Sequence, residues 1–406
     1  MHTRARLCAT AALVAVAPAL PAQLAHATNR PSAPSAPPAQ VRRIADAIAD
    51  QYIVVLKDTA APGGTPAAVA RLARTHGGTV SHTYGTVLHG YAARMTDRQA
   101  RATAADPAVA YVEQDARQRV SATQGNPPSW GLDRIDQRSL PLDKSYTYPG
   151  TASNVTAYLV DSGLRTTHAQ FQGRASIGVD EVGDGRGGQD CLGHGTHVAG
   201  TVGGKDYGVA KGVKLVAVRV TDCHDSASTS AIIAAADWIT AHAVKPAVVN
   251  MSINSTSVIS SEDTAIKKSI AAGITWVVSS GNKNTDACHN SPGDIAAAVV
   301  VNNADSGDRR RSDSDYGSCT DLFAPGTAID SAWNGSDTAT KQLTGTSMAA
   351  PHVTGAAALW LSAHPDAPPA DVAKHLTDTA TPNKISGAGS GTPNRLLYIG
   401  AATVRP

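Results

Sequence analysis

The sequence predicts an α/β protein in which a parallel sheet is sandwiched by helices, preceded by a smaller α+β domain of the ferredoxin-like kind. From Val155 onward, continuous apolar segments alternate with segments of helical spacing. Such apolar segments indicate parallel strands that are buried on both faces and covered by helices. Between Gln51 and Asp115 the segments follow the order βαββαβ, which is the ferredoxin-like pattern.

The composition argues against one class of partner. The 406 residues carry a net charge of +2, so we expect no nucleic-acid partner. The run Arg309-Arg310-Arg311 is typical of a solvated loop. Aromatic residues make up only 4% of the chain while Gly and Ala are abundant, and such small side chains let helices lie close to strands.

Residues 1–27 have the pattern of a secretory signal peptide. Arg4 and Arg6 precede the apolar segment 7–20, and Ala25-His26-Ala27 matches an A-x-A cleavage site. The apolar segment is too short to span a membrane, and no later segment is long enough. We therefore expect a secreted, extracellular protein without a membrane anchor.

The cysteine count suits an exported protein. Cys8 leaves with the signal peptide, and four cysteines remain: Cys191, Cys223, Cys288 and Cys319. Four cysteines allow three disulfide pairings, which the spacing alone does not distinguish. Cys191 lies near His194, but no set of partners with zinc-binding spacing follows.

The smaller domain is expected to contain four strands and two helices. Residues 28–50 begin with a stretch rich in Pro, Ser and Ala, and we expect a disordered linker there. Thr96 has the position of a helix cap, and Gln99 would complete a capping box. The predicted elements are a strand at 52–56, a helix at 66–76, two strands within 79–95, a helix at 96–105 and a strand at 109–113.

The larger domain is expected to alternate strands and helices. The predicted strands are Thr156–Asp161, Lys214–Arg219, Ala247–Ser252, Ile274–Ser279 and Ala297–Val301. The predicted helices are His194–Gly200, Ser228–Ala243, Asp263–Ala272, a helix entered at Ser347 with its body at Val353–Leu361, and Pro369–Thr377, before a terminal strand at Arg395–Tyr398. In such sheets, functional residues belong at the carboxyl ends of the strands.

Three short segments carry the residues of a nucleophilic mechanism. An apolar strand ends in Asp161, the segment Gly-His-Gly opens a helix at His194, and Gly-Thr-Ser opens another at Ser347. A serine hydroxyl needs a base, and the base needs an orienting acid. Asp, His, Ser is a known chain order of such triads. Two of these residues also have a structural interpretation, Ser347 as a helix cap and Asp161 as a strand-end turn former, and His197 is a rival base.

At these residues the chain resembles the subtilisin-like serine proteases (subtilases), in the proteinase K and aqualysin branch, and the matching text runs from Trp130 to Tyr398. The resemblance implies the subtilisin-like fold. It implies Ser347 as nucleophile, His194 as general base and then acid, and Asp161 as the acid that orients it. Asn282, in Ser-Ser-Gly-Asn, would donate to the oxyanion, while His197 and His352 would be structural.

The resemblance extends to the smaller domain, whose Tyr-Val-Glu lies near its end. It implies a propeptide over residues 28–121, with an inhibitor-like domain at about 51–116, and a peptidase domain over 122–406. Such a segment would template folding and inhibit the enzyme until it is removed. We expect the cut near Val120 to Thr123.

The resemblance also implies two disulfides and a calcium site. It favours the pairs Cys191–Cys223 and Cys288–Cys319, each closing a loop of about thirty residues, which contributes roughly 3 to 4 kcal/mol in the chain-entropy model. Calcium would be a structural cofactor held by the Asp321 carboxylate with the carbonyls of Ala296 and Ala298, because calcium prefers oxygen ligands. A surface aspartate in a loop is the alternative.

Substrate is expected to lie extended along two segments, with Gly281 beside them. The first segment contains Ser226 and Ala227, and the second is Ser252-Ile253-Asn254. The resembling proteins carry glycines where this chain has Asp225, Ala227 and Asn254, and alanines where it has Ser279 and Ser280. Altered specificity, neutral drift and weakened activity are all compatible with these departures.

The expected protein is therefore a secreted serine endopeptidase that hydrolyses peptide bonds through an acyl-enzyme on Ser347. It would be a monomer, made as a zymogen, with proteins or peptides as substrates and its own propeptide as an intramolecular inhibitor. One alternative is a catalytically silent binding protein with the subtilase fold. Another is a secreted esterase, although the sequence contains no Gly-x-Ser-x-Gly elbow around Ser347.

Overall fold

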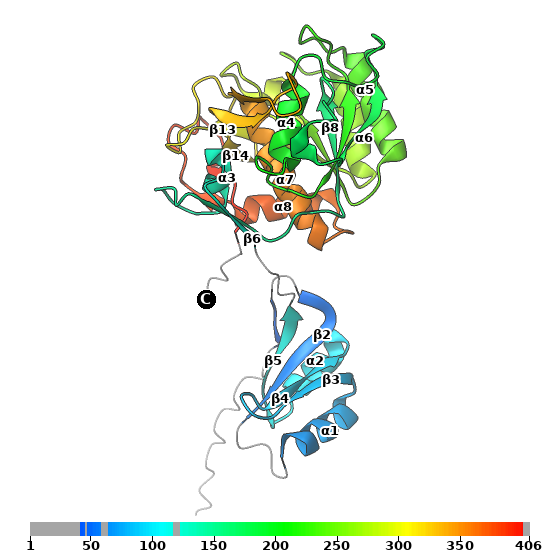
Figure 1. The fold of residues 1–406 in the computed structure, drawn as a ribbon. Coiled ribbons are helices and arrows are strands. Elements are labelled where there is room, and N and C mark those ends of the chain that lie inside the picture. The colour runs from blue at the N-terminus through cyan, green and yellow to red at the C-terminus, as the bar shows by residue number, and fades with distance from the viewer. Residues whose placement is uncertain (1–40, 45–46, 58–63, 117–121, 401–406) are drawn as a thin grey trace, which may run out of the picture. The chain divides into compact units, whose positions relative to one another are not determined.

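The computed structural model describes residues 41–44, 47–57, 64–116 and 122–400. The chain divides into two compact units, Met1–Arg117 and Gln118–Pro406 (Figure 1). The signal peptide expected at 1–27 lies outside the described residues, and so does part of the expected cleavage region. Among the described residues, no helix has the length and apolar character needed to cross a bilayer.

The smaller unit is a five-stranded sheet with two helices. Its strand order is β1-β5-β2-β4-β3, and the chain order β2-α1-β3-β4-α2-β5 confirms the ferredoxin-like pattern. Buried apolar residues of β2 and β4, such as Val54 and Tyr91, pack against Leu72 of α1 and Ala100 of α2. The elements are β1 (Val41–Arg42), β2 (Ala47–Leu56), α1 (Thr65–His76), β3 (Thr79–Tyr84), β4 (Gly90–Arg94), α2 (Asp97–Ala104) and β5 (Val109–Ala116).

One prediction for this unit is confirmed and another is wrong in part. Thr96 accepts from the Gln99 amide and Gln99 bonds back to Thr96, so the capping box is present. Residues 28–50 were expected to be a disordered linker, but Val41–Arg42 and Ala47–Asp50 lie in strands. The physical reason is pairing with β5: Val41 lies opposite Val112 in parallel register.

The larger unit contains a nine-stranded sheet of order β17-β18-β14-β13-β12-β11-β8-β10-β9. Every neighbouring pair is parallel except β17 and β18 at one edge. Its strands are β8 (Thr156–Asp161), β9 (Ala175–Asp180), β10 (Lys214–Arg219), β11 (Ala247–Met251), β12 (Thr275–Ser279), β13 (Val299–Ala304), β14 (Leu322–Pro325), β17 (Thr381–Pro382) and β18 (Arg395–Leu396). The predicted parallel sheet is confirmed.

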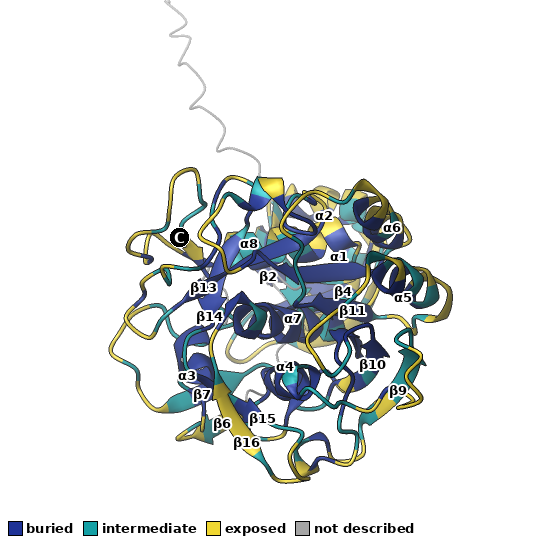
Figure 2. Cartoon of the chain, turned by 90° about the horizontal axis from the view of Figure 1, so that it is seen from above, coloured by how far each residue is buried: buried dark blue, intermediate teal, exposed yellow. Residues whose placement is uncertain are grey.

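Helices cover both faces of this sheet (Figure 1). Alternate residues of a strand belong to different cores: Leu159 of β8 packs with the helices α4 and α7, while Tyr158 packs with α5 and α6. Figure 2 shows α7 as largely buried along its length. The helices are α3 (Trp130–Ile135), α4 (His194–Gly203), α5 (Thr229–His242), α6 (Ser260–Ala271), α7 (Thr346–Ala363) and α8 (Pro369–Thr379).

Several strand boundaries differ from those expected: β11 ends one residue earlier, β12 begins one residue later, and the terminal strand β18 ends at Leu396, since pairing stops there. The strand expected at Ala297–Val301 is Val299–Ala304, since its polar end pairs with β14. The edge strand β9 was not predicted, nor were the hairpin β15 (Ile329–Ala332) and β16 (Thr340–Leu343) or the pair β6 (Ala122–Gly125) and β7 (Ser145–Tyr148). Much of β6, β9 and β16 is solvent-accessible, so these strands lack a continuous apolar signal.

Two disulfides join loops of this unit. The bonded pairs are Cys191–Cys223 and Cys288–Cys319, the pairs that the resemblance favoured. Their sequence separations are 32 and 31 residues. The first pair ties the segment just before α4 to the loop after β10.

Removing either disulfide should destabilise the larger unit to a similar extent. Because the closed loops are almost equal in length, the paired variants C191A/C223A and C288A/C319A should each lose roughly 3 to 4 kcal/mol of unfolding free energy. Denaturant unfolding of the oxidised protein and both variants measures this, and each variant is the matched control for the other. A loss below about 1 kcal/mol in either would contradict the expectation.

Candidate active site

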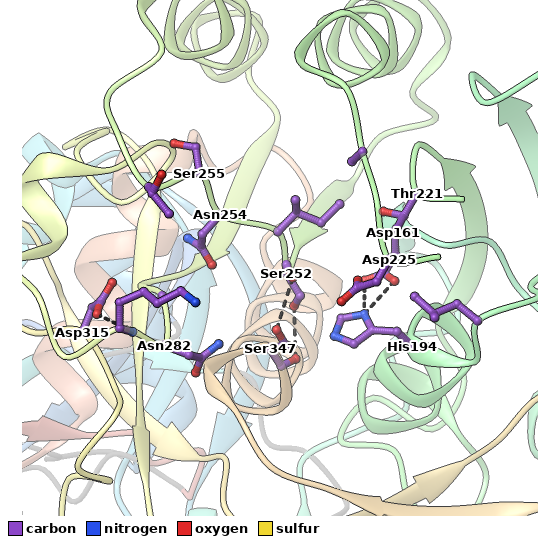
Figure 3. A pocket seen from close by; sticks show the side chains of 16 residues that line it. Asp161, His194, Thr221, Asp225, Ser252, Asn254, Ser255, Asn282, Asp315 and Ser347 are labelled. Carbon is purple, nitrogen blue, oxygen red and sulfur yellow. Dashed lines mark hydrogen bonds and ion pairs between the residues drawn. The ribbon is translucent and has the colours of Figure 1, made fainter. Parts of the chain in front are cut away.

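The predicted functional residues meet at one edge of the parallel sheet. β8 ends at Asp161, β11 at Met251 and β12 at Ser279, and these three strands are neighbours. α4 begins at His194 and α7 begins at Thr346. Together they surround a cavity of about 340 Å³ (Figure 3). Its lining residues are Asp161, Leu192, His194, Thr221, Asp225, Ala227, Ser252, Ile253, Asn254, Ser255, Thr256, Gly281, Asn282, Lys283, Asp315 and Ser347.

Asp161 and His194 form a close pair. The carboxylate of Asp161, whose residue is only 1% exposed, lies 2.7 and 2.9 Å from His194 Nδ1 through its two oxygens. A carboxylate can only accept, so Nδ1 carries the hydrogen and Nε2 retains a lone pair. Figure 3 shows the opposite side of the ring facing Ser347. His194 is thus oriented as a base toward the cavity.

The surroundings of His194 hold its pKa above the usual value of 6.5. Burial lowers this pKa, but the charge of Asp161 and the hydrogen bond to it raise it, and so do the charges of Asp225 and Asp190. The positive form of the ring is therefore stabilised by three carboxylates. This is the form that the ring takes after accepting a proton.

Asp190 was missed in the sequence and fixes the start of α4. Its carboxylate accepts from the backbone amides of Gly193 (2.7 Å) and Thr196 (2.9 Å) and from the hydroxyl of Ser162 (2.9 Å). An acid a few residues before a helix is a capping signal that could have identified it. Gly195 completes the arrangement, because a Cβ there would lie 2.2 Å from the carbonyl oxygen of Gly163.

Ser347 is the second residue of α7. Its hydroxyl donates to the backbone oxygen of Ser252 at 3.2 Å, and the Ser252 hydroxyl donates back to the Ser347 carbonyl at 3.1 Å. Within the described residues, no hydrogen bond joins Ser347 to His194. Catalytic hydrogen bonds are often long or misaligned in free enzymes and tighten with substrate, so the facing ring is the relevant observation.

Asn282 presents its amide nitrogen to the cavity. Its Oδ1 accepts from the backbone amide of Thr346 at 2.9 Å and from the Thr346 hydroxyl at 3.1 Å. The backbone N–H of Thr346 can only donate, so the Asn282 atom that faces it must be the amide oxygen Oδ1. The amide nitrogen Nδ2 of Asn282 is therefore left free to donate to another group. The first-turn amides of α7 lack helical acceptors, which makes the Ser347 N–H a second potential donor beside Ser347 Oγ.

Asp315 holds the loop that carries Asn282 and was not identified in the sequence. One of its oxygens accepts from the amides of Lys283 (2.9 Å) and Thr285 (2.8 Å), and the other accepts from Asn290 Nδ2 (3.2 Å). Gly281 has φ 115°, and a Cβ there would lie 2.2 Å from Asp315. The loop therefore needs both the glycine and the carboxylate, which no local pattern reveals.

Comparisons with known proteins agree with this geometry. The family model "Subtilase family" matches residues 152–396, and the model "Peptidase inhibitor I9" matches residues 51–121. The first match covers more than half of the chain. The chain belongs to the subtilase family.

Individual relatives are similar over most of their length. This subtilase is 48% identical to the "Extracellular serine proteinase" of Thermus sp. (strain Rt41A), over 87% of this chain and 90% of that protein. It is 36% identical to "Proteinase R" of Parengyodontium album, over 87% and 89%. The solved "cold adapted subtilisin-like serine proteinase" is 45% identical with a TM-score of 0.65, covering 67% of this chain and 98% of that one.

The two other histidines of the subtilase's helices α4 and α7 have different surroundings. His197 Nε2 lies 3.0 and 3.1 Å from the carbonyls of Ile329 and Lys341 in the β15–β16 hairpin. His352 Nδ1 lies 2.9 Å from the carbonyl of Met348. Both rings are fully buried, and burial lowers each pKa to about 4. Both bond to structural carbonyls, so neither competes with His194 as a base.

The cavity includes most of the expected substrate segments. Ala227, Ser252, Ile253, Asn254 and Gly281 line it, whereas Ser226 does not. The sequence did not identify the lining residues Leu192, Thr221, Ser255, Thr256 and Lys283, which are placed only by tertiary structure.

Asp225 lines the cavity on the His194 side. Its φ of 63° is a left-handed conformation that favours glycine and that aspartate tolerates. An aspartate in place of glycine therefore keeps the backbone conformation while adding a charge.

The expected calcium ligand Asp321 lies away from the cavity, just before β14. Its Oδ2 accepts from the Val300 amide at 2.8 Å. Among the described residues no lysine or arginine forms an ion pair with it, and burial raises its pKa to about 6 although the charge of Arg395 opposes this. The β13–β14 pairing places Asp321 next to the segment that follows Ala298. A partly buried carboxylate that forms no ion pair among the described residues fits a bound cation.

Asp225→Gly should shift the acid side of the activity profile to lower pH. The Asp225 charge raises the pKa of His194, and removing it favours the neutral base at a more acidic pH. The pH dependence of kcat/KM measures this shift for a peptide substrate. Asp366→Asn, at an exposed turn between α7 and α8, removes the same charge elsewhere and is the control. An unchanged or upward shift in Asp225→Gly would rule out this coupling.

Proposed function

We propose that this subtilase is a secreted serine endopeptidase that uses Asp161, His194 and Ser347 as its catalytic triad. The observation that carries the proposal is the Asp161–His194 pair, with the free side of the imidazole facing Ser347 beside the amide of Asn282. The resemblance noted from the sequence supports the same assignment. A catalytically silent binding protein would not require a histidine that is oriented by a carboxylate toward a serine hydroxyl.

The residues divide the reaction as follows. Ser347 Oγ attacks the peptide carbonyl while His194 Nε2 takes its proton, and Asp161 holds the ring tautomer and stabilises its positive form. Asn282 Nδ2 and the Ser347 backbone N–H bind the developing oxyanion. His194 then gives its proton to the leaving amine as the acyl-enzyme on Ser347 forms. Water, activated by the same ring, hydrolyses that ester.

The proposed location and regulation rest on the first third of the chain and on the relatives. The signal-peptide pattern at residues 1–27 and the Thermus relative, named extracellular, support secretion. The Peptidase inhibitor I9 match over residues 51–121 supports a propeptide that inhibits the enzyme until it is cleaved off. We propose a zymogen processed near Val120 to Thr123, and a monomeric mature enzyme.

Endopeptidase activity is proposed because the lining of the cavity extends past Ser347 to Asp225 on one side and to Asp315 on the other. A Vibrio alginolyticus relative, 40% identical, is named an exoprotease. Cleavage inside casein and inside peptides blocked at both ends distinguishes the two modes, because an exopeptidase requires a free terminus.

Ser347→Ala should abolish peptide hydrolysis, with a loss on the order of 10⁶ in kcat, the figure measured for the corresponding serine of a subtilisin. Asn282→Ala should lose less, about 10²–10³, a figure that also comes from a subtilisin. Hydrolysis of casein, a blocked peptide anilide and a short ester is compared, with and without a serine-directed inhibitor.

Asn383→Gly is the control for Asn282→Ala and should retain activity, because Asn383 is exposed, lies outside the cavity and has a φ of 59° that glycine also adopts. Turnover of the ester alone would support an esterase instead. No turnover by fully processed protein would support the silent binding protein and contradict the proposal.

We further propose that Asp321, with the carbonyls of Ala296 and Ala298, holds a structural calcium ion. A bound cation would offset the charge of the partly buried Asp321 and stabilise the fold without taking part in the reaction. Only the ionised carboxylate binds, so binding should weaken as the pH falls through the pKa of about 6.

Chelation should lower the Tm of the subtilase at pH 8 and much less at pH 5. At a calcium concentration a hundred times the Kd, binding contributes about 2.7 kcal/mol, and chelation removes it. Asp321→Asn should abolish the sensitivity of Tm to calcium, whereas the exposed control Asp366→Asn should keep it. Full calcium sensitivity in Asp321→Asn would disprove the assignment of this ligand.

A further inference from the structure

Two cavity segments are clamped together by one side-chain pair. Ser252–Asn254 follows β11 and Ser279–Gly281 follows β12, and these strands are parallel neighbours. Asn254 Nδ2 donates to the Ser279 carbonyl at 2.6 Å, and the Ser279 hydroxyl donates to Asn254 Oδ1 at 2.6 Å. The Asn254 amide therefore spans the space between the two segments.

This bridge lies on the surface of the cavity. Asn254 lines the cavity, whereas Ser279 does not and is fully buried. The Asn254 amide consequently separates Ser279 from the open space. Figure 3 shows Asn254 and Ser255 on one side of that space and Asn282 on the other, with Ser347 between Asn282 and His194.

The position of Asn282, the proposed oxyanion donor, determines which substrate side chain lies against the Asn254–Ser279 bridge. When the attacked carbonyl carbon lies at Ser347 Oγ and its oxygen points to Asn282, the side chain of the same residue must extend away from His194. It enters between the segment 253–256 and the segment 281–283, whose residues line this part of the cavity. Asn254 lines this part of the cavity, and its partner Ser279 is buried behind it.

We propose that Asn254, locked by Ser279, is the floor of the pocket for the residue whose carbonyl is attacked and restricts it to small side chains such as alanine, serine or glycine. This inference rests on the proposed function. A phenyl ring reaching the position of the amide would break both hydrogen bonds and leave the buried Ser279 groups unpaired, which is costly. A glycine at position 254 would remove the bridge and deepen the pocket.

The test compares two blocked peptide anilides that differ only in alanine or phenylalanine before the cleaved bond. The enzyme obtained by processing of the full-length chain should have a higher kcat/KM for the alanine anilide than for the phenylalanine anilide. Asn254→Gly should raise the Phe/Ala ratio of kcat/KM by at least about tenfold, the scale on which pocket shape discriminates apolar side chains. Ser279→Ala, which removes one of the two bonds, should raise it by a smaller factor.

Asn383→Gly is the matched control. It is an exposed asparagine with φ 59°, where glycine fits the backbone, and it should keep the wild-type ratio. If Asn254→Gly does not yield folded protein, Ser279→Ala decides the matter, since it leaves Asn254 and the backbone in place.

The outcomes separate this inference from the proposed function. Labelling with a serine-directed phosphonyl fluoride measures the amount of enzyme with a reactive Ser347 in every sample. The inference about Asn254 would be wrong if labelled wild-type enzyme preferred the phenylalanine anilide. It would also be wrong if the Phe/Ala ratio of kcat/KM were unchanged in the labelled variants. Either result would leave the proposed peptidase activity unaffected. Absence of both labelling and cleavage in processed wild-type protein would instead overturn the proposed function.

Discussion

The parallel direction of β8, β11 and β12 is the constraint on which the site depends. Because the strands run the same way and are neighbours, Asp161, Ser252 and Ser279 lie at one edge of the sheet. The helices α4 and α7 begin near this edge, so their first residues face it. A buried aspartate, a histidine and a serine from positions up to 186 residues apart in sequence (161 to 347) are thereby brought together. The two helix starts also supply backbone N–H groups where negative charge is to be held.

The charges around His194 come from three different kinds of structure. Asp161 ends a strand, Asp190 caps α4 and Asp225 lies on a loop that the Cys191–Cys223 disulfide ties to the same region. All three raise the pKa of the ring against its burial. The site therefore favours the imidazolium that forms during proton transfer, while the free nitrogen stays within the cavity. Because the pKa of His194 is raised, the neutral form of its ring begins to be lost at a higher pH than in a free histidine.

Sequence patterns predicted those parts of the fold that have continuous apolar segments and those parts of the site that lie in short motifs. β8 and β10 have the predicted bounds, and the Asp161–His194 pair follows from two motifs. Asp315 could not be predicted, because its role depends on the loop at Gly281, which is distant in sequence and fixed by backbone amides. β1 could not be predicted for a similar reason: two residues form a strand only because β5 offers its edge. In each case the missing information was a contact between distant segments.

The Asn254–Ser279 bridge bears on the three interpretations that the sequence left open. The resemblance noted from the sequence implies that both residues depart from its pattern, and the structure shows them bonded to each other by two hydrogen bonds. Without Asn254, the hydroxyl of the fully buried Ser279 would lose its side-chain acceptor, at a cost of about 1 to 3 kcal/mol. Introduced together they satisfy one another, so independent drift at the two positions is the less economical explanation. Weakened activity does not follow either, because the bridge leaves the Asn282 amide and the His194 ring free. Under the proposed function, a matched polar pair at the wall of the cavity changes which substrate side chains the cavity admits.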